Sequence, residues 1–147
     1  MSFGKNGANA NAVNNQGETP LHVASSNGKQ EIVQFLIDKG ASIEATENSG
    51  STPLHFAAKN GRKSTVECLL ENGANANAQN NERKTALHLL SGFWSSDIRK
   101  ALLRHGADSE VEDIFGKKPK QYWHSSSHFD FDWASESDTD SYFSDSD

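Results

Sequence analysis

The sequence of 147 residues contains a single cysteine, three prolines and no long apolar run. One cysteine excludes an intrachain disulfide and fits a reducing compartment. No apolar stretch approaches the roughly 18 residues that a membrane-spanning helix needs, and the N-terminus lacks the charged-then-apolar pattern of a secretory signal. We therefore expect a soluble intracellular protein, cytoplasmic or nuclear, that does not interact with a membrane.

The sequence also lacks the motifs of common enzyme classes. It has no glycine-rich phosphate loop, no paired-cysteine metal spacing, and no Ser, His and Asp set apart from positions that recur along the chain. Nor is there a basic stripe, since 14 Lys and Arg stand against 20 Asp and Glu, so direct nucleic-acid binding is disfavoured. We predict a protein that is not an enzyme and uses no metal or other cofactor.

A period of 33 residues organises what is present. Thr19, Thr52 and Thr85 are spaced by that interval. The same spacing relates four glycines and three leucines, which are Gly7, Gly40, Gly73 and Gly106, and Leu21, Leu54 and Leu87. A fixed period of this size predicts stacked structural units.

Each unit is expected to form two short helices and an extended connector. Thr52 suits the cap of the first helix, and Pro53 suits its first turn, where a missing N–H does no harm. Apolar residues at helical spacing give the second helix one buried face, and a glycine such as Gly73 closes it in the left-handed conformation. The small, turn-rich residues 74–78 suit a connector.

These motifs resemble the ankyrin repeat, whose Thr-Pro-Leu-His-x-Ala signature is matched at residues 19–24 and 52–57 and more loosely at 85–90. The resemblance implies an all-α repeat solenoid of helix-turn-helix units with protruding β-hairpin fingers. It also implies a groove, lined by finger tips and first helices, where partner proteins dock. In that family the histidine of the motif bonds within its own turn and to the neighbouring unit. His22, His55 and His88, one per layer, cannot converge on one metal ion.

The chain divides into a repeat domain, residues 1–123, and an acidic tail, residues 124–147. We expect a partial unit at 1–13, repeats at 14–46, 47–79 and 80–112, and a capping half-repeat at 113–123. Either the chain is a piece of a longer protein, or the first repeat exposes apolar surface on its N-terminal side and invites self-association. Lys118, Lys120 and Gln121 make the last half-repeat polar, as in a terminal cap, and Trp123 is expected to close the core.

The third repeat departs from the pattern. Arg83 stands where residues 17, 50 and 116 are glycine, so this finger must accept a non-glycine residue, at a cost of about 1 kcal/mol if φ is positive. Phe93 and Trp94 replace an asparagine and a glycine in the turn between the helices. Two interpretations stay open for this pair, an anchor for a partner or packing beneath the C-terminal segment. Ile114 and Phe115, at the last finger tip, are candidates to extend the same apolar surface.

The candidate partner-binding residues lie at the finger tips and between the helices. Asparagine is common in the tips, where it tolerates positive φ. Cys68 aligns with Phe35 and Ala101 and is expected to fill the core, not to act as a nucleophile. The candidates are Asn15, Gln16, Glu18, Asn48, Ser49, Ser51, Lys59, Asn81, Glu82, Lys84, Phe93, Trp94, Ile114 and Phe115.

The tail holds seven carboxylates and no Lys or Arg, which leaves 14 basic and 13 acidic residues in the repeats. Its serine-rich, acidic composition without a helical or strand period predicts disorder in isolation. Aromatic residues interleaved with the acids form a mixture that can dock on a basic surface; they are Phe129, Phe131, Trp133, Tyr142 and Phe143. Ser135, Ser137 and Ser144 each have an acid three residues on and are candidate phosphorylation sites.

We therefore predict a protein–protein interaction module, an adaptor or inhibitor that holds its partner in the groove while the tail covers a basic surface of that partner. The layout is similar to that of inhibitors of Rel-type transcription factors, on architecture alone. Two alternatives stay open. The chain is a segment of a larger ankyrin scaffold with a solubilising tail, or the tail folds back on Phe93, Trp94 and Phe115 and is released by phosphorylation or a competitor.

Overall fold

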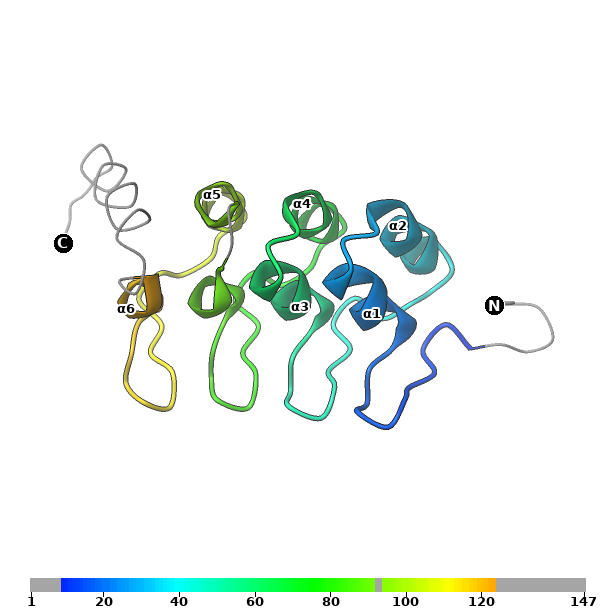
Figure 1. Ribbon diagram of the computed structural model, residues 1–147, viewed down its shortest axis with the longest axis horizontal. Helices are drawn as coiled ribbons and strands as arrows, with labels where there is room; N and C mark the ends of the chain where they lie inside the picture. Colours follow the sequence, from blue (N-terminus) through cyan, green and yellow to red (C-terminus); the bar gives the residue numbers. More distant parts are fainter. Residues whose placement is uncertain (1–8, 92–93, 124–147) are drawn as a thin grey trace.

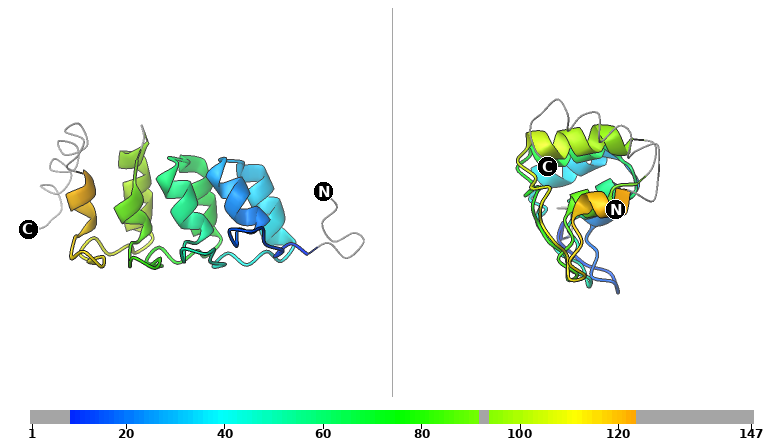
Figure 2. Two further views of the ribbon diagram at one scale, coloured as in Figure 1. Left: turned by 60° about the horizontal axis from the view of Figure 1, so that its bottom comes forward. Right: turned by 90° about the vertical axis from the view of Figure 1, so that its left-hand side faces the viewer.

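The computed structural model describes residues 9–91 and 94–123. Their helices form two parallel rows, with loops that project from one side of the stack (Figure 1). The inner row holds α1 (Pro20–Ser26), α3 (Pro53–Lys59), the 3-10 helix η1 (Ala86–Leu89) and α6 (Pro119–Trp123). The outer row holds α2 (Gln30–Asp38), α4 (Lys63–Glu71) and α5 (Ser95–Arg104). Viewed along the stack, successive units superpose (Figure 2).

Local chemistry starts each inner helix. Thr52 is extended, with φ −93° and ψ 170°, and its hydroxyl accepts from the backbone N–H of His55. The backbone N–H of Thr52 donates in return to Nδ1 of His55 at 3.0 Å. The same reciprocal cap occurs between Thr19 and His22. Because two helix-terminal donors are satisfied at once, the helix start is fixed by the Thr-Pro-Leu-His sequence itself.

The first helix of the third repeat is shorter than predicted. We expected an α-helix like α1 and α3, but only Ala86–Leu89 is helical, as a single 3-10 turn, and Leu90 is extended with φ −57° and ψ 134°. Ser91 and Gly92 stand where α3 has Ala58 and Lys59. Glycine costs about 1 kcal/mol in a helix relative to alanine, and serine also ranks below alanine and lysine. The weaker helix formers explain the early end.

The core is a thin layer between the two rows. Leu21, Leu54 and Leu87 of the inner row are buried, as are Val33 and Val66 of the outer row. Neighbouring helices within each row pack against one another, and α1, α3 and η1 also pack against the outer helix of their own unit, so the layer is continuous from α1 to α6. Burial in such a solenoid depends on adjacent units.

The projecting loops stand where β-hairpin fingers were expected, but within the described part of the chain none of them is assigned as a strand. Each is a tight turn, as in the first, where Asn14 N–H donates to Glu18 O at 3.0 Å and Gly17 N–H donates to Asn14 O at 2.9 Å. We refer to these four loops as fingers, and they comprise residues 14–18, 47–51, 80–84 and 113–117.

Candidate protein-binding surface

Backbone hydrogen bonds join the four fingers into one row. The N–H groups of Asn48, Asn81 and Ile114 donate to a carbonyl of the preceding finger at 3.0, 2.9 and 2.9 Å respectively. The acceptors are Gln16, Ser49 and Glu82. Since the links are made by the main chain, the tips hold a fixed spacing whatever side chains they carry (Figure 1).

Two of the junctions carry a second bond that requires glycine. The Asn48 side-chain amide donates to Asn15 O, and that of Asn81 to Asn48 O, both at 3.2 Å. The amide lies directly over the glycine of the preceding finger. A Cβ on Gly17 would lie 2.6 Å from Asn48 Oδ1, and one on Gly50 would lie 2.4 Å from Asn81 Oδ1. Both glycines also have a φ near +80°, so any other residue meets strain and a clash.

At the last junction, both the glycine and the asparagine are replaced. Arg83 stands at the glycine position with φ 61°, and Ile114 stands at the asparagine position. Ile114 has no amide to lie over residue 83, so a Cβ is accommodated there. The sequence predicted a backbone cost at Arg83 on the condition that its φ is positive, and the φ of 61° meets that condition. The link of Arg83 to Ile114 was missed. The signal was available in the register, because residues 48, 81 and 114 are each 33 apart.

At this altered junction, two large apolar side chains are exposed, and the residues beneath them are held in place. Ile114 is 49% exposed and Phe115 is 60% exposed. The ammonium group of Lys84 lies 5.0 Å from the Phe115 ring and 5.2 Å from the Tyr122 ring. The Lys84 side chain is only 13% exposed, so it forms a platform beneath the Phe115 ring. The sequence had instead indicated that Lys84 contacts a partner directly.

Charge and hydrogen bonds hold this platform in place. Burial alone would lower the pKa of Lys84, but its hydrogen bond to Glu82 and its electrostatic interactions with Tyr122, Glu82 and Asp113 raise it. Burial alone would raise the pKa of Asp113, but the Tyr122 hydroxyl and the N–H groups of Lys117 and Phe115 donate to its carboxylate and lower it. Both groups therefore stay charged, and the attraction between them and the rings fixes the last finger.

Trp94 forms a separate apolar patch. It lies at the start of α5 in the outer row, is 44% exposed, and is covered on one face by Lys63 at 5.1 Å from the ring centroid. Ile114 and Phe115 lie in the last finger, on the other side of the inner row (Figure 1). The single surface considered from the sequence is therefore divided into two among the described residues.

The other predicted contact residues differ in exposure. Ser51 is buried and Glu18 is half-buried, so both offer little surface. Those that are exposed are Asn15, Gln16, Asn48, Ser49, Lys59, Asn81 and Glu82. Those outside the described residues are Phe93, the tail aromatics Phe129, Phe131, Trp133, Tyr142 and Phe143, and the serines Ser135, Ser137 and Ser144.

The motif histidines connect one unit to the next. Nδ1 of each accepts a hydrogen bond from the N–H of its own threonine, so Nε2 carries the proton and donates to a carbonyl of the following unit. The pairs are His22 with Ser51 at 2.8 Å, His55 with Lys84 at 2.8 Å and His88 with Lys117 at 3.0 Å. Burial lowers the pKa of all three below the usual 6.5. These contacts assign the histidines to the fold, in line with the prediction.

The described residues offer little for catalysis. In residues 9–91 and 94–123, no three His, Cys, Asp or Glu side chains are placed to hold a metal ion together. Cys68 is buried, its thiol contacts Gln34 Oε1 at 3.5 Å, and burial raises its pKa. A thiol in that state is a poor nucleophile.

The N-terminal side of the first repeat forms an open, largely apolar cavity of 580 Å³, lined by Val13, Val23 and Ile32 among others. Ile32 is 49% exposed, whereas Thr65, at the same position of the second repeat, is 1% exposed. Phe35 and Cys68 show the same contrast, at 47% and 5%. The preceding unit covers these positions in the second repeat.

Comparison with protein families agrees with the architecture. Residues 5–57 match the family model described as ankyrin repeats in many copies, and residues 43–113 match the one described as ankyrin repeats in three copies. A search of curated proteins found no match to the chain. Across the described residues, no helix has the length and apolar character needed to cross a membrane. The chain thus belongs to the ankyrin-repeat family, whose repeats are typically non-catalytic and generally bind other proteins.

Proposed function

We propose that the chain is a non-catalytic adaptor or inhibitor that binds a partner protein along the finger row and the inner helices, with Ile114 and Phe115 as the anchor. The observation that carries this proposal is the pair of exposed apolar side chains on the rigid base of Lys84, Asp113 and Tyr122. Anchors of this kind dominate interface energies because they bury area without losing much conformational freedom on binding.

The rest of the finger row suits a supporting role. Its exposed tips carry neutral hydrogen-bonding groups, including Asn15, Gln16, Asn48 and Ser49. Such groups set the orientation of a partner and contribute less to affinity than the anchor. Lys59, exposed at the end of α3, extends the same surface toward the helices.

The acidic tail is the second binding element of the proposal. Its seven carboxylates favour a partner with a basic surface, and the aromatics among them supply contact area. Phosphorylation of Ser135, Ser137 or Ser144 would add negative charge and strengthen that attraction. The expected partner therefore has an apolar pocket for Ile114 and Phe115 beside a basic surface, and the complex is expected in the cytoplasm or the nucleus.

The decisive experiment restores the regular finger junction. In the double variant Arg83→Gly/Ile114→Asn, the last junction regains the glycine and asparagine of the first two, so folding is retained while an anchor residue is removed. We expect affinity-purified partners to be lost with this variant and kept with Val13→Asn, which changes an exposed apolar residue at the opposite end. Equal recovery of the same partner with both variants would refute the anchor.

The tail is tested separately with a chain that ends at Trp123. A basic partner that binds the full chain more tightly, by a margin that shrinks as salt rises, supports the role of the tail. Equal binding of both chains at every salt concentration removes the tail from the proposal and leaves the finger row.

A second candidate function is self-association through the cavity at the N-terminal side. It is favoured by Ile32 and Phe35, which are about half exposed where the next repeat is covered. Glu18 and Lys29 also line the cavity, so a two-fold pairing of two copies can set an acid against a base. Sedimentation of the full chain and of Ile32→Asn tests this. We expect a concentration-dependent dimer that the substitution abolishes, and a monomer throughout would refute it.

A further inference from the structure

The charge of the outer helices changes along the stack. α2 carries two acidic residues and no basic one, α4 carries two acidic and one basic, and α5 carries one acidic and three basic. Their net charges are therefore −2, −1 and +2. The acid of α5, Asp97, pairs with Lys63 of α4 at 3.7 Å, toward the preceding unit. The cations of α5 are Arg99, Lys100 and Arg104.

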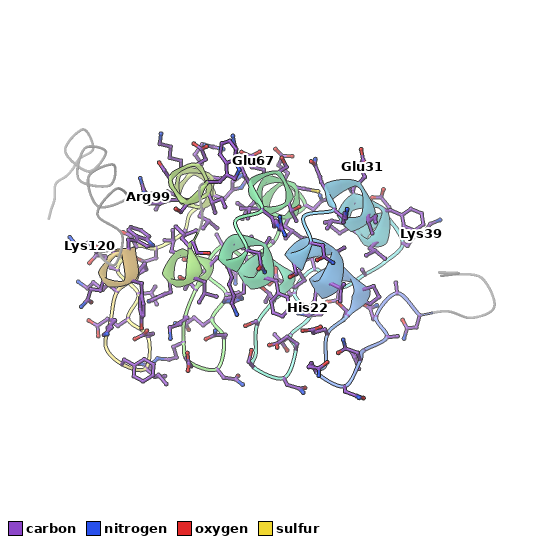
Figure 3. The ribbon with its side chains drawn as sticks, viewed as in Figure 1. His22, Glu31, Lys39, Glu67, Arg99 and Lys120 are labelled. Carbon is purple, nitrogen blue, oxygen red and sulfur yellow. The ribbon has the colours of Figure 1, made fainter. Side chains whose placement is uncertain are left out.

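Arg99 occupies a core position. It stands 33 residues after Val66 and 66 after Val33, and all three side chains are at most 1% exposed. Its guanidinium carbon lies 5.4 Å from the centroid of the Trp123 ring. Figure 3 places it on the side of α5 toward α6, where a further unit of the stack would follow. A buried guanidinium is stable where carboxylates and ring faces meet it, so this position favours acidic neighbours.

Contacts between successive outer helices follow a narrow range of sequence offsets. Gln34 hydrogen-bonds to Asn72 and to Cys68, which are 38 and 34 residues later. Lys63 contacts Trp94 and Asp97, which are 31 and 34 residues later. The same offsets from Arg99 reach residues 130–137, which include Asp130, Asp132 and Glu136. An offset of 34 from Arg104 reaches Asp138.

We propose that the segment 130–138 docks in cis along α5, with Asp130, Asp132 and Glu136 around Arg99, and Asp138 at Arg104. The segment then takes the outer-row place of the fourth unit. Chain length permits this, because Asp130 follows Trp123 by seven residues, which span up to about 25 Å when extended. The inference goes beyond the proposed function, since the dock needs no partner.

Docking in cis also has an advantage that a partner must overcome. A segment tethered a few residues from its site has an effective concentration in the millimolar range. It therefore occupies α5 even where each ion pair is weak, and it resists salt better than the same contact between two molecules. A basic partner of the tail would have to compete with α5 for the same carboxylates.

Paramagnetic relaxation in the full chain tests the dock. The native thiol is first removed with Cys68→Ala, since Ala101 fills the same position of α5. A nitroxide is then placed at Ala134→Cys, and amide line widths are compared with and without the spin label. We expect broadening of several-fold at Ser95–Arg104 and none in α2, at the other end of the stack.

A second sample tests whether the contact forms between two molecules. It mixes isotope-labelled chains lacking the nitroxide with nitroxide-bearing chains at natural isotope abundance. In that sample we expect the amide signals of α5 to stay sharp.

Two matched triple variants test which carboxylates are used. Asp130, Asp132 and Asp138 are changed to Asn in one, and Asp140, Asp145 and Asp147 in the other, so both lose the same charge. The first is expected to abolish the broadening at α5 and the second to keep it. The proposal is overturned if α5 is not broadened, if broadening appears only in the mixed sample, or if both variants reduce it equally.

Discussion

The two ends of the stack differ in how far their apolar side chains are covered. At the N-terminal side, Val23 and Ile32 are exposed around an open cavity, and Phe35 is exposed on the same helix as Ile32. At the C-terminal end, α6 covers the last repeat, and Trp123 is 5% exposed with its indole N–H donating to Leu87 O at 3.0 Å. The sequences of the repeats are close copies, so the neighbour of each unit, not its own sequence, decides what is buried.

The comparison is clearest for two isoleucines at the same position of their repeats. Ile32 and Ile98 occupy the same place in the first and third repeats, yet Ile32 is 49% exposed and Ile98 is 0% exposed. We expect Ile98→Ala to lower the free energy of unfolding by about 2–5 kcal/mol, the range for buried aliphatic truncations. Ile32→Ala should cost less than about 1 kcal/mol, because a half-exposed side chain buries little area in the monomer. Urea denaturation of both variants measures the difference.

Concentration separates burial from self-association in that experiment. If copies of the chain pair through the open side, the cost of Ile32→Ala rises with protein concentration while that of Ile98→Ala does not. Equal costs for the two variants at low concentration would contradict the view that the preceding neighbour sets the burial.

The fingers allow a second comparison, between an internal and a terminal glycine. Gly50 and Gly116 have φ of 81° and 74°. A Cβ at Gly50 would lie 2.4 Å from Asn81 Oδ1, whereas none would meet an atom within 4 Å at Gly116. Gly116→Ala should therefore cost only the left-handed backbone, about 1–2 kcal/mol, and Gly50→Ala more. Thermal unfolding of the two variants measures this, and equal shifts in Tm would show that the asparagine moves aside freely.

These residues also show what the sequence could and could not supply. The 33-residue period placed the helices and their caps, because each rests on chemistry within one unit or on its copy in the next, and the resemblance to the ankyrin repeat supplied the histidine contacts. The coupling of Arg83 to Ile114 and the platform under Phe115 were not predicted. The repeat register aligns Ile114 with two asparagines, but it does not show that this position meets the residue 31 earlier, in the preceding finger. That relation, like the contact between Lys84 and Phe115, appears only when the fingers are side by side. Likewise, the shortness of η1 was not predicted, because the weak helix formers that end it do not disturb the 33-residue period.

The histidine contacts predict a dependence of stability on pH. Burial holds the pKa of His22, His55 and His88 below 6.5 in the folded state, so the unfolded chain binds protons first as the pH falls. The stabilisation is complete above pH 6.5, declines as the pH falls below that value, and levels off below the lowered folded pKa values. Denaturant unfolding between pH 7.5 and 5 should reveal the decline.

The capping half-repeat supplies a control for this titration. Gln121 stands at the histidine position, and its amide oxygen accepts from the N–H of Lys118 at 2.8 Å, as Nδ1 does elsewhere. His88→Gln should therefore keep the local cap and remove about one third of the pH slope contributed by the three histidines, since the slope scales with the number of protons bound. An unchanged slope would assign the pH dependence to other groups.

The smallest effect is expected at the altered junction. Arg83→Gly relieves the left-handed backbone, about 1–2 kcal/mol for a side-chain-bearing residue, but returns about 0.4–1 kcal/mol through the greater freedom of glycine in the unfolded chain. By these figures the net gain should lie between about 0 and about 1.6 kcal/mol. Ile114→Asn should be more costly in the native background than in the Arg83→Gly variant, because the amide would lie against the Cβ of Arg83 as it would against one at Gly17 or Gly50. A double-mutant cycle in urea should therefore give a favourable coupling of about 1 kcal/mol. Additive costs would mean that residues 83 and 114 are energetically independent, and that the exposure of Ile114 is not a consequence of Arg83.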